Sequence, residues 1–468
     1  MNPSVGNSLA LRLAVVALAI GVALVAALVL KTPPPPATLR VAAVEQPPEK
    51  RSTEEILALL PVPETNSLKG KVMAAGVAQV RKAPDNAVAW VTLGDLLAQW
   101  ERDSGDPKYH DLAEMAYLHA LELNAKSTDA MAGMAWVTGG RHAFGESVRW
   151  AEQALEVNPG NAAAVGIRGD AAVELGDYDK AFEDYQKMMD LRPDLSSWSR
   201  GAHLLWLTGE KDRAVSLMER AIKAGAPFAE NTAWCRAKLA MMHFHDGKLA
   251  AAAEALDPSL TASSRNVHVL LAAGRLATAL GDPDGARKFY GIILESGPNH
   301  EALAALGDLC AQSGEADAAE KYYSQVEALH AGKATHDHLQ MARFYADHDR
   351  KLVDALRLAE QNKLTRNVLE ADVLAWVYFK NGDLSRASEA MKRALSRNTP
   401  DPELHFHAGM IAAAAGDRPA ARQHLEKALK FNPQFSVLLA PVAVKTLAQL
   451  DGNAPPATAA AEKSTATP

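Results

Sequence analysis

Three histidine pairs are candidate metal ligands in this sequence, because imidazole commonly binds metal ions. Two histidines flank a single residue at His243–His245, His336–His338 and His405–His407. Side chains two positions apart on a helix do not share a face, so such a pair cannot readily clamp one ion. The sequence GDPDG at Gly281–Gly285 resembles part of a calcium loop but lacks the glutamate that closes such a loop. We predict a turn there and no metal site in the chain.

The two cysteines, Cys235 and Cys310, are the next candidates. They lie in segments that the repeat pattern described below keeps apart, so we expect two buried free thiols and no disulfide. The sequence contains no CxxC, HExxH, P-loop or dinucleotide-binding pattern. We therefore predict that the protein is not an enzyme and holds no cofactor.

The charge balance bears on the class of partner. The chain is 48% hydrophobic and has a formal net charge of −7. A nucleic-acid-binding domain usually carries a basic footprint, which this composition lacks. We predict that nucleic acid is not a partner.

A repeated pattern defines the elements that must position these residues. The stretch ELGDYDKAFEDYQKMMDLRP at 174–193 has a near-copy, AAGDRPAARQHLEKALKFNP, at 414–433. Each copy has a glycine turn, then a predicted helix, then a proline that ends it. The turn glycines are spaced by about 34 residues or twice that, a period typical of stacked two-helix units. They are Gly176, Gly209, Gly247, Gly281, Gly314, Gly382 and Gly416.

Two motifs within the unit point to a family. WVTLG at 90–94 has the W-x2-L-G spacing, while Ala181, Tyr185 and Pro193 fit the A-x3-F and terminal proline of the same pattern. The sequence therefore resembles tetratricopeptide repeats from about residue 85 to 433. The resemblance implies an all-α fold, an α-solenoid that forms a right-handed superhelix of about ten helix pairs.

Some units depart from the pattern. Copies without a turn glycine are expected near His142 and His348, the first unit carries the insertion ERDSGDPKYHD, and the fifth has a shortened second helix. We expect these departures to change local curvature and to preserve the fold. Small residues at one position of the first helix should let it approach the second closely: Gly94, Ala135, Gly169, Ala202, Gly274, Gly307, Ala375 and Gly409.

The resemblance also implies a partner-binding surface, because the family's concave face is lined by fixed positions of each first helix. Transferred to this sequence, that register predicts a protein or peptide client held by Trp136, Asp170, His203, Trp206, Trp234, Met241, Phe244, Arg275, Asp308, Trp376 and Phe379. The alternative for the aromatic members is packing between neighbouring helices. Trp206, Trp234 and Phe244 fall in adjacent units, where they could anchor a peptide.

The N-terminal segment indicates a membrane anchor. Leu13–Leu30 is an unbroken apolar run, about 27 Å long as a helix, which nearly spans a bilayer core of about 30 Å. We predict a cytoplasmic N-terminus at 1–12, a single transmembrane or signal-anchor helix at 9–31 and a Pro-rich stalk at 32–63. The repeats would face the periplasm from a bacterial inner membrane. The alternative is a signal peptide that is cleaved to release the protein into the periplasm.

The segments flanking the repeats are expected to be caps. We predict a capping helix at 64–84, which reads as a lone second helix, then the solenoid at 85–435. A second capping helix is expected at 436–450, and the Ala/Pro-rich tail at 451–468 should be disordered.

These expectations describe a membrane-anchored scaffold or adaptor for a protein or peptide client in envelope assembly or protein maturation. One narrower alternative is an apocytochrome-holding chaperone of cytochrome c maturation, which rests on the layout of anchor and repeats alone. Another is an enzyme or accessory factor for cell-envelope polymers. A third hypothesis, association of the chain with further copies of itself as a homo-oligomer, stays open.

Overall fold

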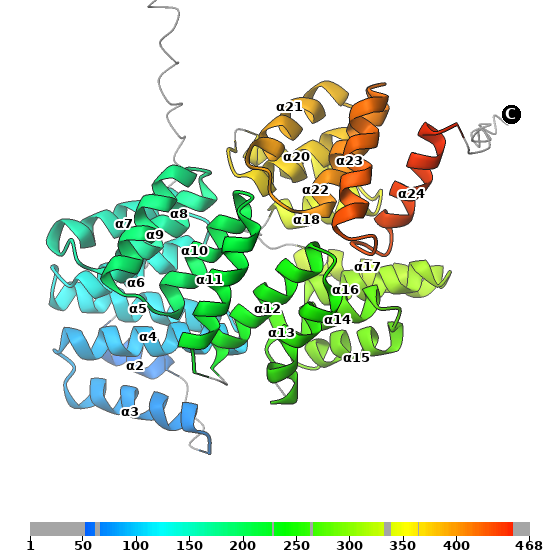
Figure 1. Ribbon diagram of the computed structural model, residues 1–468. Helices are drawn as coiled ribbons and strands as arrows, with labels where there is room; N and C mark the ends of the chain where they lie inside the picture. The colour runs from blue at the N-terminus through cyan, green and yellow to red at the C-terminus, as the bar shows by residue number, and fades with distance from the viewer. Residues whose placement is uncertain are drawn as a thin grey trace, which may run out of the picture. The chain divides into compact units, whose positions relative to one another are not determined.

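The computed structural model describes residues 52–60, 66–226, 229–262, 265–331, 338–363 and 365–452. All regular structure in this part of the chain is helical (Figure 1). The predicted anchor at 9–31, most of the stalk at 32–63 and nearly all of the tail at 451–468 lie outside the described residues. Within the described ranges, none of the helices has both the length and the hydropathy needed to cross a bilayer.

Ten consecutive helix pairs form the body of residues 51–468, which make one compact unit. The first helices are α4 (Ala87–Ser104), α6 (Thr128–Gly140), α8 (Ala162–Glu174), α10 (Leu195–Leu207), α12 (Glu230–His245), α14 (Val267–Ala279), α16 (His300–Gln312), α18 (His338–Asp347), α20 (Val368–Lys380) and α22 (Pro402–Ala414). The second helices are α5 (Lys108–Leu123), α7 (Phe144–Val157), α9 (Tyr178–Leu191), α11 (Lys211–Ala224), α13 (Leu249–Thr261), α15 (Pro283–Leu294), α17 (Ala316–His330), α19 (Leu352–Ala359), α21 (Leu384–Ala394) and α23 (Arg418–Phe431). The expected α-solenoid of about ten pairs is confirmed.

Three further helices lie outside the pairs. They are α2 (Thr53–Leu59) and α3 (Leu68–Lys82) before the first pair, and α24 (Leu439–Leu450) after the last. Short 3₁₀ turns follow α19 and α21 at Glu360–Asn362 and Leu395–Arg397. The helix α3 packs on α4 as a second helix packs on the next first helix, and α24 packs on α23 and α22 as a first helix would.

The turn within each pair has a local cause. All seven predicted turn glycines have positive φ, as Gly176 does at 70°, a conformation that glycine adopts at little cost. In the four pairs where an aspartate follows the glycine, it caps the second helix; the Asp177 side chain accepts a hydrogen bond from the Lys180 N–H at 3.3 Å. In the two pairs without a glycine, His142 and Asp349 adopt the same left-handed backbone, with φ of 59° and 52°. The predicted copies near His142 and His348 therefore exist.

Small residues on the first helices make room for a ring of the second helix. A Cβ added at Gly169 would lie 2.6 Å from Cε1 of Tyr185, and one added at Gly274 would lie 2.5 Å from Cε1 of Tyr290. Gly94 and Gly307 are covered by tyrosines in the same way. The close approach expected at these positions is confirmed.

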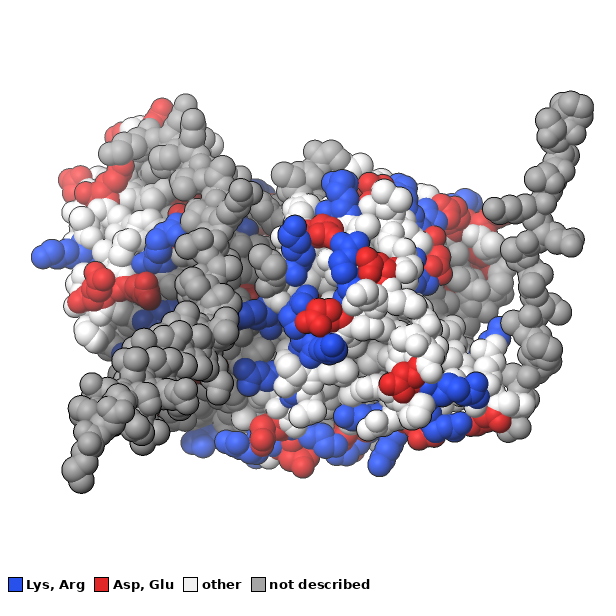
Figure 2. Space-filling model, turned by 90° about the horizontal axis from the view of Figure 1, so that it is seen from above, with Lys and Arg blue, Asp and Glu red and all other residues white. Residues whose placement is uncertain are grey.

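The face of the molecule seen in Figure 2 has basic and acidic side chains interspersed rather than gathered by sign. Both cysteines are buried and free, as predicted. The histidines of one alternating pair point apart: His405 Nδ1 lies 3.1 Å from Nδ1 of His424, whereas His407 Nδ1 lies 3.0 Å from an oxygen of Asp372.

Candidate partner-binding site

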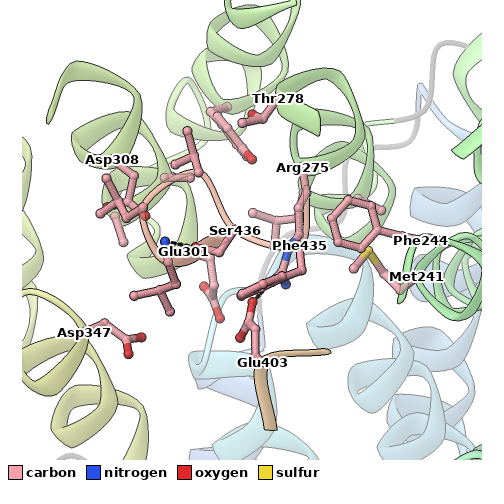
Figure 3. Close-up of a pocket in the computed structure, with 18 of the residues that line it drawn as sticks. Met241, Phe244, Arg275, Thr278, Glu301, Asp308, Asp347, Glu403, Phe435 and Ser436 are labelled. Atoms are coloured by element: carbon pink, nitrogen blue, oxygen red, sulfur yellow. Dashed lines mark hydrogen bonds and ion pairs between the residues drawn. The ribbon is translucent and has the colours of Figure 1, made fainter. Parts of the chain in front are cut away.

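A cavity of about 500 Å³ lies between four first helices and one irregular segment. The helices α12, α14, α16 and α18 form its main walls, and the segment Gln434–Leu439, between α23 and α24, forms another (Figure 3). Met241, Phe244, Arg275 and Asp308, all predicted partner-binding residues, line this cavity.

The register of the first helix explains why these side chains converge. Gly274 and Gly307 are each covered by a tyrosine of their own second helix. The next residues, Arg275 and Asp308, line the cavity. The same element therefore places a small residue against its partner helix and a polar residue in the cavity.

Glu403 is the central charged group of the site. It stands on α22, is buried, and accepts hydrogen bonds from Arg275 on α14 and Arg343 on α18 (Figure 3). Burial alone would raise the pKa of this carboxyl, but the two guanidinium groups outweigh it and hold the pKa at about 2. Glu403 therefore joins three helices as an anion.

Asp308 is engaged by two groups of its own fold. Its Oδ1 accepts hydrogen bonds from the Tyr323 hydroxyl at 2.9 Å and from Nε2 of His348 at 2.7 Å. Burial would lower the pKa of His348, but the hydrogen bond to Asp308 and its charge raise it overall. One oxygen of the carboxylate is therefore already engaged inside the protein.

Asp170 repeats this arrangement in another pair, outside the cavity. Its oxygens accept hydrogen bonds from the Tyr185 hydroxyl at 2.8 Å and from Nε of Arg200 at 2.8 Å. In both pairs the tyrosine comes sixteen positions after the small residue, at Gly169 and Gly307, and the aspartate directly follows that residue. This spacing could have predicted the internal hydrogen bond from the sequence. The family register, which placed Asp170 and Asp308 on the binding surface, does not take it into account.

The remaining predicted residues lie elsewhere on the first helices. Trp206 and Trp376 are buried, and the Trp376 indole N–H donates to Asp347 at 2.8 Å. Phe379 stacks on Trp376 with ring centroids 5.0 Å apart.

Trp136, Trp234 and His203 are each partly exposed, and the two tryptophans lie beside basic side chains. Trp136 lies under the Arg102 guanidinium at 5.6 Å, and Trp234 lies under the Lys238 ammonium at 5.2 Å. Burial lowers the pKa of His203 to about 3, so this histidine is neutral. Trp206, Trp234 and Phe244 do not line one cavity together, and the partner-binding role of all eleven residues stays a prediction.

The segment Gln434–Leu439 was not among the predicted site residues. It begins after Asn432, whose side chain donates to the Phe244 carbonyl at 2.8 Å, and Phe435 is buried against Phe406 with ring centroids 5.7 Å apart. This contact joins residues far apart in sequence, so no local pattern signals it. One wall of the cavity is thus supplied by the C-terminal end of the solenoid.

Comparison with known families agrees with the geometry of the pairs. Profiles described as tetratricopeptide repeat match residues 141–196 and 373–434, and a further profile of the same description matches residues 243–309. These segments carry tetratricopeptide repeats. Proteins built from such repeats use extended surfaces to bind other proteins. No curated protein matches the chain.

Several solved structures resemble parts of this chain. PilF of Pseudomonas aeruginosa is 19% identical, with 45% of this chain and 90% of that chain covered and a TM-score of 0.34. PilW, described as a widely conserved type IV pilus biogenesis factor, is 17% identical, with 44% and 95% covered and a TM-score of 0.37. The Cut9–Hcn1 hetero-tetramer of the APC/C matches at 12% identity, with 85% and 92% covered and a TM-score of 0.36. At these values the likeness carries no conclusion about function.

Proposed function

We propose that the protein is a scaffold that holds a protein or peptide client in the cavity between α12, α14, α16 and α18. The observation that supports this proposal is the convergence of Met241, Phe244, Arg275 and Asp308 on one cavity of about 500 Å³. A cavity of this size, lined by both apolar and polar side chains, is within the range of ligand sites.

The internal partners of the charged side chains in the cavity indicate which kind of client side chain could bind there. Glu403 is neutralised by two arginines and Asp308 is held by Tyr323 and His348. The lining also offers a client apolar side chains such as Met241 and Leu271, beside polar ones such as Lys238 and Gln434. We infer that the client inserts an apolar side chain, because burying apolar area requires no unpaired charge in the site.

A cavity-filling substitution tests this function without removing an existing contact. Ala305 lines the cavity, and Ala305→Phe should fill part of it; Ala253→Phe, on the exposed face of α13, is the matched control. Full-length parent and variants would be immobilised in detergent and used to capture proteins from solubilised envelope extract. We expect a client that parent and control both retain and Ala305→Phe loses at least tenfold. A client set identical for all three proteins would refute the cavity as the binding site.

The location of the scaffold is a separate part of the proposal. The apolar run Leu13–Leu30 supports a single-pass bacterial inner-membrane protein with its repeats in the periplasm. Alkaline phosphatase fused after Pro433 should be active in this orientation, since that enzyme requires an oxidising compartment. An inactive fusion that is present at normal abundance would place the repeats in the cytoplasm.

A further inference from the structure

The last helix of the chain, α24, has the composition of a buried helix but one open side. Its sequence LAPVAVKTLAQL is mostly apolar, and its polar residues Lys445, Thr446 and Gln449 gather on one side, away from Ala440 and Ala443. The first helix α22 buries residues from Pro402 to Ile411 on all its faces. In contrast, the buried residues of α24 are Ala440 and Ala443, and Val444 is 56% exposed.

The reason is the position of α24 in the repeat. Every first helix from α4 to α22 is covered by its own second helix, whereas α24 packs on α22 and α23 with no second helix following it in the described part of the chain (Figure 1). The side of α24 that a second helix would cover is therefore open within the described residues.

The opposite end of the solenoid has the complementary defect. The helix α3 packs against α4 as a second helix would, but no first helix of its own precedes it within the described residues. Leu68 on α3 is 79% exposed, and Val72, one turn further on, is also exposed. A terminal repeat normally presents a polar outer face, so apolar side chains at both ends need an explanation.

We propose that α24 of one copy and α3 of a second copy pair head to tail and complete one tetratricopeptide repeat between them. The joint buries Val444 of one copy against Leu68 and Val72 of the next. Because the two surfaces differ, the interface is heterologous and leaves a free α3 and a free α24 at the ends of every assembly.

A second feature of the solenoid supports the same partner. The turns of the third, fourth and fifth pairs are covered by the loops that follow the eighth, ninth and tenth pairs: Gly176 by Arg366, Gly209 by Arg397 and Asn398, and Gly247 by Phe431. The turns of the sixth, seventh, ninth and tenth pairs, at Gly281, Gly314, Gly382 and Gly416, have open space where a Cβ would point.

When the stack continues into the second copy, its first two loops cover the turns at Gly281 and Gly314. The order is the one seen within a single chain, where each loop covers the turn five pairs earlier. The loop after α3 of the second copy, Ala83–Asn86, comes over Gly281, and the loop at Asn124 comes over Gly314. Asn124 has the local geometry of Asn432: each Oδ1 accepts the N–H two residues on, at 3.1 Å from Lys126 and 2.8 Å from Gln434. Asn432 uses its amide group to donate to the Phe244 carbonyl, and Asn124 of the second copy has the same group to offer.

Mixing two interface variants tests this arrangement. Val444→Asp removes a functional α24 end and Leu68→Asp removes a functional α3 end; Val353→Asp, at a residue 80% exposed on α19, is the control. Sedimentation velocity of the full-length protein in detergent should show concentration-dependent oligomers for parent and control. Each end variant alone should be monomeric, with association weakened at least tenfold. A 1:1 mixture of the two should form a dimer and nothing larger, since it retains one intact α24 end and one intact α3 end.

The outcomes separate clearly. A parent that stays monomeric at all concentrations, or a mixture that stays monomeric while the parent associates, would overturn the proposal. Equal dissociation of the Val353→Asp control would also overturn it. Val444→Ser replaces Val444→Asp if the latter loses its helical thermal melt. Client capture by the Val444→Asp variant should be unchanged, so a failure of self-association is distinguishable from a failure of the cavity.

Discussion

Replacing Glu403 by glutamine should change how the stability of the solenoid depends on pH. The carboxyl is buried and its pKa is lowered from 4.5 to about 2. A lowered pKa contributes stability above the unfolded value, and this contribution is lost as pH falls from about 4.5 toward 2. The Glu403→Gln variant lacks this titration, so its stability should fall less steeply over the same range.

The magnitude follows from the two pKa values. Between pH 6.5 and pH 4, linkage gives a loss of about 0.8 kcal/mol in the free energy of unfolding, and about 2 kcal/mol by pH 3. The side chains of Arg275 and Arg343 are 40% and 39% exposed, so solvent screens part of their attraction. We expect about half of these figures as the difference in slope between parent and Glu403→Gln.

The assay is urea unfolding followed by circular dichroism at pH 6.5, 4 and 3. Glu389→Gln, which removes an exposed carboxylate on α21, is the matched control and should follow the parent. At pH 6.5 the glutamine variant should be less stable than the parent, because two guanidinium groups lose their shared anion. Parallel pH curves for parent and Glu403→Gln would refute the account of Glu403 as a buried anion.

Three further perturbations test other parts of the molecule. Tyr185→Phe removes the hydroxyl that donates to Asp170 and should cost about 1 kcal/mol in urea unfolding; no change would show that Arg200 alone satisfies the carboxylate. Asn432→Ala leaves the Phe244 carbonyl without its donor and should cost about 1–3 kcal/mol and speed amide exchange in α24; unchanged exchange there would contradict this anchoring. Burial raises the pKa of the Cys235 thiol to about 12, so iodoacetamide at pH 8 should label it about 1000-fold faster in urea than in the folded protein; rapid labelling of the folded protein would contradict its burial.

The repeat pattern was predictable because its causes are local. A positive φ at the turn requires glycine or a tolerated substitute, and the chain has Gly416 at 81° where the sequence predicts a turn. The lone second helix predicted at 64–84 corresponds to α3 at Leu68–Lys82. Each of these features depends on residues within one or two helical turns, so one sequence contains the necessary information.

The site was predictable only in part. The family register placed Met241 and Arg275 on the surface that lines the cavity. It did not show that Asp308 is engaged by Tyr323, although the spacing of the two residues carried that signal. Glu403 reaches Arg275 across 128 residues, a contact that depends on how far the solenoid turns over five pairs. No periodicity in the sequence reports that rotation.

Contacts between distant repeats set this chain apart from a simple stack. In most solenoids each repeat touches only its neighbours, and stability is a sum of local terms. Here the Val368 N–H donates to the Tyr178 hydroxyl at 2.9 Å, and the Thr399 hydroxyl donates to the Leu207 carbonyl at 2.6 Å. The early and late pairs therefore stabilise one another. Because Asn432 anchors the segment that walls the cavity, any event that displaces the last pair must also open the proposed client site.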